Sequence, residues 1–170
     1  MTLQDRTDSD VTSLAFFLAD FAAVESGKAY VSGGFWDRIA VPEFPSAAFF
    51  SVVAVIRVPW DAYDVVHNFA ITVHDADGAE LAPGFDGQFQ VSGALHLRVG
   101  DPTIMPVTAT IPGMSFAAPG DYAFVLQIDG AEIDRWPLRV ALMDPPDDAV
   151  QAGSPLEYGI PPYPAAPHQQ

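Results

Sequence analysis

Apolar residues recur at every second position on both sides of the dipeptide Asp129-Gly130, and this period excludes a helix there. On the first side, the apolar positions are Tyr122, Phe124, Leu126 and Ile128, and on the second they are Trp136, Leu138, Val140 and Leu142. Asp-Gly supplies the two positive φ angles of a tight hairpin turn. The sequence therefore predicts an antiparallel hairpin over residues 121–142.

Further segments with strand character are separated by glycine- and proline-containing turns, among them Ser26-Gly27, Pro83-Gly84 and Pro112-Gly113. The expected strands cover residues 12–19, 28–33, 35–41, 47–58, 64–74, 87–92, 94–99 and 104–111. For residues 14–24 a short helix is the alternative, since alanine and leucine favour helices. Many short strands at this spacing indicate an all-β, antiparallel, immunoglobulin-like sandwich. Tyr122, after Pro119-Gly120, stands where such sandwiches carry their corner tyrosine.

The composition divides the chain into three parts. Residues 1–10 are polar and acidic and are expected to form a flexible leader, and residues 11–142 form the sandwich domain. Residues 143–170 hold seven of the 16 prolines and no lysine or arginine, which predicts an acidic, extended tail. Such a tail either keeps the protein in solution or docks into an aromatic-lined groove.

The charge of the chain limits its partners. It carries 22 acidic side chains against 7 lysines and arginines, a net charge of −15. Nucleic acids and anionic membranes are bound by clustered cations, so neither is an expected partner. The absence of cysteine and of an N-terminal signal sequence favours a cytoplasmic location.

The segment 47–58 is apolar on both faces, unlike an ordinary antiparallel strand. Phe50, Val52, Ala54 and Ile56 belong to one face. Phe49, Val53 and Val55 make the other face apolar as well, and these three residues are the candidate interface. Either a loop or a terminus of the chain covers them, or they bind a protein partner or a second copy.

Residues with chemical potential do not form a recognisable catalytic motif. His67 is interpreted as a hydrogen-bonded residue at the edge of the core, and His74 and His96 fall on polar strand faces. No histidine spacing typical of a metal site occurs, and Asp75-Ala76-Asp77-Gly78 is interpreted as a turn rather than a calcium loop. Gly33-Gly34 is interpreted as a second tight turn. We therefore predict no catalytic residue, no metal, no cofactor and no small-molecule ligand.

A block near the N-terminus resembles a family of small bacterial proteins that carry a domain of unknown function. The matching positions are Leu18, Asp20, Ala22, Val24, Gly27, Lys28, Gly33, Gly34 and Trp36. Arg57-Val58-Pro59-Trp60 and the hairpin near Asp129 fit the same pattern, while Ala29 replaces a larger aliphatic residue. The resemblance covers residues 12–142 and implies a compact β-sandwich without an assigned activity or catalytic residue.

From these observations we expect a non-catalytic module for binding or assembly, acting through protein–protein contacts. One alternative is a structural component of a larger particle, with the tail contacting its neighbours. Another is a small hydrolase that uses His67, His74 or His96 with nearby carboxylates.

Overall fold

The computed structural model describes residues 10–92 and 98–143, and within them the chain is almost entirely β-structure. Nine strands and one short 3-10 turn, η1 (Trp60–Ala62), occupy these residues. Residues 1–9 of the expected leader, residues 144–170 of the expected tail, His96 and most of the expected strand 94–99 lie outside them. No helix in the described ranges is long and apolar enough to cross a bilayer.

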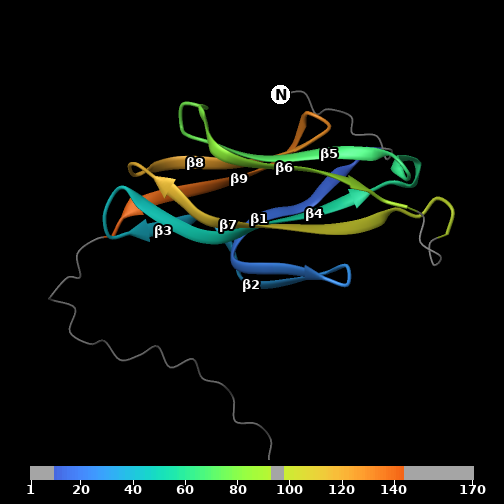
Figure 1. Ribbon diagram of the computed structural model, residues 1–170, viewed down its shortest axis with the longest axis horizontal. Coiled ribbons are helices and arrows are strands. Elements are labelled where there is room, and N and C mark those ends of the chain that lie inside the picture. Colours follow the sequence, from blue (N-terminus) through green and yellow to red (C-terminus); the bar gives the residue numbers. More distant parts are fainter. Residues whose placement is uncertain (1–9, 93–97, 144–170) are drawn as a thin grey trace, which may run out of the picture.

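The strands form two sheets that pack face to face (Figure 1). The four-stranded sheet has the order β2 (Lys28–Trp36), β1 (Thr12–Glu25), β4 (Ser46–Val58), β7 (Thr103–Phe116). The five-stranded sheet has the order β3 (Arg38–Val41), β9 (Ala131–Leu142), β8 (Gly120–Ile128), β5 (Val66–His74), β6 (Glu80–Gln90). All neighbouring strands are antiparallel except the pair β3 and β9. The predicted all-β sandwich is confirmed.

Alternation along the strands produces the core between the sheets. In β8, Phe124 and Leu126 are completely buried, and in β4 Val52 and Ile56 are buried against them. Burying a side chain of this size contributes about 1.5–3 kcal/mol. The inner faces of β4 and β8 are therefore principal sources of the stability of the sandwich.

Turn chemistry predicted from the sequence accounts for two hairpins and one corner. Ser26-Gly27 and Asp129-Gly130 both have two successive positive φ angles, 50° and 72° in the first and 50° and 80° in the second. These angles define the two-residue turns that join β1 to β2 and β8 to β9. The Tyr122 hydroxyl donates to the carbonyl oxygen of Ala118 at 2.9 Å, the upstream bond expected of a corner tyrosine.

Several local expectations differ from the structure, among them a turn at Pro112-Gly113, which lies within β7. The helical alternative for residues 14–24 fails because β1 continues from Thr12 to Glu25. The turn expected at Gly33-Gly34 is a bulge within β2, where Gly33 has φ +60°. β6 begins at Glu80 and runs through the turn expected at Pro83-Gly84.

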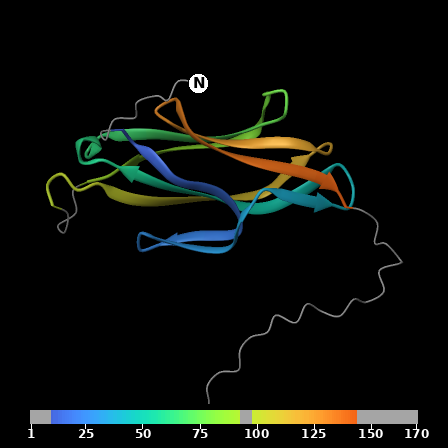
Figure 2. The same cartoon turned by 180° about the vertical axis from the view of Figure 1, so that it is seen from behind.

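The paired ends of β1 and β2 leave the sandwich as an arm, which we define as residues 20–35. β1 pairs with β4 as far as Ala19, opposite Ser51, and beyond that point it pairs only with β2. Figures 1 and 2 show this hairpin below β4 and β7, the other two strands of the four-stranded sheet. The arm thus lies over part of the outer face of β4.

Candidate functional site

His67 is a buried connector rather than a free base. Its Nδ1 lies 2.7 Å from Asp129 Oδ2, and its Nε2 lies 3.2 Å from the carbonyl oxygen of Ala62. The ring also stacks on Phe89 with 5.2 Å between centroids. Both ring nitrogens are therefore engaged, in agreement with the interpretation of His67 as a hydrogen-bonded residue at the core edge.

Asp129 is the residue whose carboxylate contacts His67 Nδ1. Its Oδ1 accepts the Asn68 backbone N–H at 2.8 Å while Oδ2 faces His67. The hydrogen bond from His67, followed by that from the Asn68 backbone, holds the pKa of Asp129 below its ordinary value. The carboxylate thus ties the β8–β9 turn to β5, and through His67 to η1.

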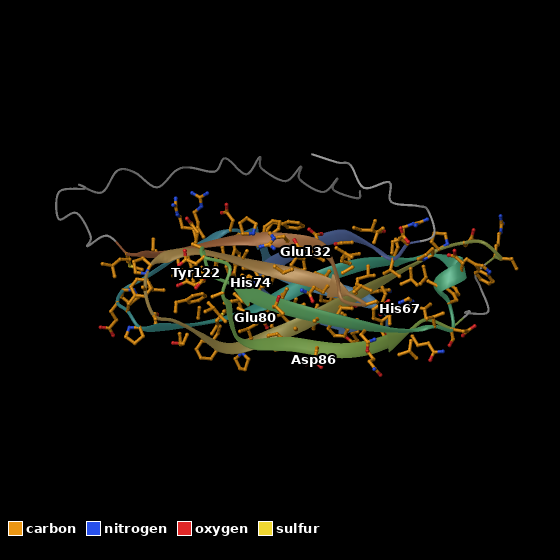
Figure 3. The ribbon with its side chains drawn as sticks, turned by 90° about the horizontal axis from the view of Figure 1, so that it is seen from above. His67, His74, Glu80, Asp86, Tyr122 and Glu132 are labelled. Carbon is orange, nitrogen blue, oxygen red and sulfur yellow. The ribbon has the colours of Figure 1, made fainter. Side chains whose placement is uncertain are left out.

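His74 is engaged in a different place. Its Nε2 lies 2.9 Å from Thr72 Oγ1, and its Nδ1 lies 3.2 Å from the carbonyl oxygen of Gly78. Figure 3 shows His74 near Glu80 and Glu132 and well separated from His67. Seven residues of extended strand correspond to roughly 23 Å, so the two histidines cannot act on one substrate group.

The acidic groups near His74 do not complete a metal site. In residues 10–92 and 98–143, no three histidine, aspartate or glutamate side chains are grouped to hold an ion. The pKa of Glu132 is lowered mainly by its hydrogen bonds with Arg135, which donates to both carboxylate oxygens at 2.9 Å. Glu132 therefore serves a surface ion pair.

A shallow polar depression of about 340 Å³ lies on the five-stranded sheet. Gln88 Nε2 donates to Asn68 Oδ1 at 2.9 Å within it. Its other lining residues are Phe69, Ala70, Asp86, Gly87, Gln127 and Gly130. Asp86 is the single ionisable side chain among these residues, and no histidine or second carboxylate lines the depression beside it.

The three residues of the predicted interface do not form one exposed patch. Phe49 is 74% exposed, Val55 is half-buried, and Val53 is fully buried. Val53 packs with Phe17, Ala19 and Ala22, so the chain itself covers this part of β4. Val53 is thus removed from the candidate interface, and Ala22, which belongs to the arm, provides part of its cover.

The arm is anchored to the sheet at this point. The Ala22 backbone N–H donates to Ser51 Oγ at 3.1 Å, and both residues are buried. At the base of the arm, Phe35 stacks on Phe17 with 3.8 Å between ring centroids. These contacts fix the arm against the sandwich and leave its opposite face in solvent.

Exposed apolar side chains gather on the arm. Of the 13 large hydrophobic residues recorded as exposed among the described residues, five belong to it. They are Phe21, Val24, Tyr30, Val31 and Phe35. The sequence pattern was not interpreted as predicting this surface. The signal that could have identified it is the Ser26-Gly27 turn between two apolar segments, which indicates a hairpin with no polar face.

Within residues 10–92 and 98–143, no second strand pairs with the outer edge of β2. The two-residue turn makes Glu25 and Lys28 a hydrogen-bonded pair, so the pairs Ala23–Tyr30 and Phe21–Ser32 are of the same kind. Ala29 and Val31 then direct their N–H and C=O groups away from β1. They form the open edge of the four-stranded sheet.

The other sheet edges carry features that hinder strand addition. β7 contains Pro106 and Pro112, β6 carries Glu80 and Asp86, and β3 has only four residues. Prolines, charges and shortness all discourage pairing with a further strand. β2 has no proline and a single charged residue, Lys28. Of the four edges, β2 is the one best suited to accept a strand.

The chain matches the model of one known protein family over most of its described residues. Residues 14–141 match DUF6941, a family of unknown function. The chain belongs to this family. The DUF6941 match spans every strand described above apart from the first residues of β1 and the last of β9, so the arm lies within the family domain.

Two other comparisons were made. No curated protein matches the chain. Among solved structures, the chain is similar to an alkylpurine DNA glycosylase, AlkC, from Pseudomonas fluorescens, bound to DNA containing an abasic site analog. The TM-score is 0.41 and the identity 8%, over 78% of this chain and 31% of that chain. The chain thus spans less than a third of the glycosylase, and a likeness at this level identifies no function.

Proposed function

We propose that this DUF6941 protein is a non-catalytic, cytoplasmic binding module that takes up an extended segment of a protein partner at the free edge of β2. The observation that carries the proposal is the coincidence of an open strand edge with exposed apolar side chains on the arm. Strand addition derives affinity from backbone hydrogen bonds and specificity from alternate side chains.

The chemistry of the arm defines the segment that it accepts. Ala29 and Val31 supply the backbone groups, while Tyr30 and Phe21 lie on one face and Val24 and Val31 on the other. A segment with apolar residues on both faces is matched to this edge. A strongly acidic segment is disfavoured, because the chain has a net charge of −15.

The strand order supports a binding module of immunoglobulin-like type. In such a sandwich, one layer corresponds to β1, β4 and β7. The other layer corresponds to β9, β8, β5 and β6, with β3 alongside β9. In this arrangement β2 is an addition at the edge of the first layer. A strand added to the framework, with apolar residues on both faces, is suited to contact a partner.

Photo-cross-linking from the arm tests the proposal. A photoreactive phenylalanine analogue replaces Tyr30, or Gln88 in the control, which lies on the polar depression of the five-stranded sheet. In extracts of the native host, we expect a protein adduct of defined mass from position 30 and none from position 88.

Two substitutions at Ala29 make the test specific for strand addition. Ala29→Pro removes the outward N–H, which β1 does not use, whereas Ala29→Val retains it. The adduct should disappear with proline and persist with valine. An adduct that is insensitive to proline, or equal yields from positions 30 and 88, would contradict the proposal.

A further inference from the structure

We infer that the arm is a hinged cover, which opens as one unit and exposes the part of the outer face of β4 that it covers when closed. The closed form is the one described above, with Ala22 against Val53. In the open form Val53 is accessible on the same face of β4 as Phe49 and Val55. The inference concerns the isolated chain and does not depend on the strand partner proposed above.

The arm has few contacts with the sandwich. Of residues 20–35, only Ala22 is buried. Among the described residues, one hydrogen bond holds this part of the chain to the sheet beyond the end of the β1–β4 pairing, from the Ala22 backbone N–H to Ser51 Oγ. The recorded ion pairs include no side chain of the arm. Segments with so few buried contacts open at a lower free energy than the rest of a fold.

The apolar cluster beneath the arm is separate from the main core. Its buried members are Phe17, Ala19, Ala22 and Val53, whereas Val52 and the other inner-face residues of β4 belong to the core between the sheets. Three of the four buried members lie on the sandwich itself, so opening withdraws only Ala22. The arm can therefore open while the two sheets stay packed together.

The base of the arm contains a strained residue that the closed form holds in place. Gly33 and Phe35 have φ angles of 60° and 67°, and positive φ is costly for a residue as bulky as phenylalanine. The Phe35 ring stacks on Phe17, yet 66% of the residue stays exposed. Opening releases this conformation and loses little burial, so Gly33 and Phe35 are suited to act as the hinge.

The hairpin itself is built to move as one piece. From Ala22 to Glu25, each residue of β1 has its partner in β2, from Val31 to Lys28. These pairs lie entirely within the arm, so none of them has to break when the arm leaves the sheet.

Cysteine labelling tests the inference, because the chain has no cysteine of its own. Val53→Cys and Val52→Cys place the same side chain at neighbouring positions of β4, both 0% exposed, one in the cluster beneath the arm and one in the main core. In the full chain, a thiol reagent should modify position 53 at least about tenfold faster than position 52, after each rate is corrected for the global unfolding of its variant. Ser51→Ala removes the acceptor of the Ala22 N–H and should raise the rate at position 53 several-fold further. The corrected rate at position 52 should not change.

Amide hydrogen exchange on the unmodified chain provides a second test that needs no substitution. The Ala22 amide should exchange through opening of the arm, whereas the Tyr30 amide, bonded within the hairpin, should stay protected. Equal corrected labelling at positions 53 and 52, or an Ala22 amide that exchanges only on global unfolding, overturns the inference. Loss of protection at Ala22 and Tyr30 at one common rate also overturns it, because the hairpin would then melt and not open as a unit.

Discussion

At the scale of single residues, His67 and Asp129 show how a suspected catalytic pair serves a structural purpose. The carbonyl oxygen of Ala62 can only accept a hydrogen bond, and an ionised Asp129 carboxylate can also only accept. His67 therefore lies between two acceptors, the carbonyl oxygen in η1 and the carboxylate of the β8–β9 turn. The sequence pattern predicted that His67 lies at the core edge. It did not predict the contact of His67 with Asp129, because 62 positions separate the two residues.

This connection predicts a specific dependence of stability on pH. The pKa of Asp129 is lower in the folded protein than its ordinary value, so its stabilisation is complete above the unfolded pKa of about 3.9. It is lost as the pH falls through the lower, folded pKa. Asp129→Asn, which tolerates the positive φ of this turn, should reduce the free energy of unfolding by about 1 kcal/mol near neutral pH.

Denaturant unfolding from about pH 7 to about pH 3 measures this difference around the carboxylate titration range. The gap between wild type and Asp129→Asn should close towards the acidic end. Asp86→Asn, at an exposed carboxylate on the polar depression, should follow the wild-type curve. A gap of constant size across the whole range would show that the ionised carboxylate does not stabilise the turn.

At the scale of elements, the bulge at the base of the arm explains what the sequence could and could not predict. Some tight turns and some bulges place a glycine at positive φ, so Gly33-Gly34 is compatible with either and was assigned to the wrong one. By contrast, Ser26-Gly27 and Asp129-Gly130 were correctly predicted as turns, the first from its turn-forming residues and the second also from the alternating segments beside it. The extra residue near Phe35 also shifts the register of β1 against β2, which is invisible to a pattern of period two.

Substitution of Gly33 by alanine should separate the cost of backbone strain from the cost of steric crowding at the base of the arm. A Cβ at Gly33 would occupy the position of the Asp20 carboxyl group, whereas a Cβ at Gly27 would meet nothing. Both glycines have positive φ, 60° and 72°, so alanine carries a similar backbone penalty of about 1 kcal/mol at each. Gly33→Ala should therefore destabilise the protein more than Gly27→Ala does.

The two free energies of unfolding, measured in denaturant, decide this point. Asp20→Ala combined with Gly33→Ala should remove most of the excess cost, because the carboxyl group is then absent. Equal costs for the two alanine variants would mean that Asp20 moves aside freely and does not define the base of the arm.

At the scale of the whole molecule, the sequence was sufficient for the sandwich but not for its binding surface. The period-two patterns on both sides of Asp129-Gly130 identified the buried faces of β8 and β9, which supply one side of the core. The apolar outer face of β4 was correctly noticed, but part of the cover over Val53 comes from the folded-back arm, which is held by contacts such as that of Ala22 with Ser51. Neither the hydrophobic period nor the strand propensity of the sequence predicts such contacts. The candidate binding surface therefore lies on the arm and not at Val53.

The central claim is that the free edge of β2 pairs with another strand. Amide hydrogen exchange at residue resolution tests it most directly, in dilute protein and in the complex identified by the Tyr30 cross-link. The Ala29 and Val31 amides should exchange rapidly in the dilute protein and slowly in the complex, while the Tyr30 amide, bonded to β1, should be protected in both. Rapid exchange of Ala29 and Val31 within the complex would contradict strand addition at β2.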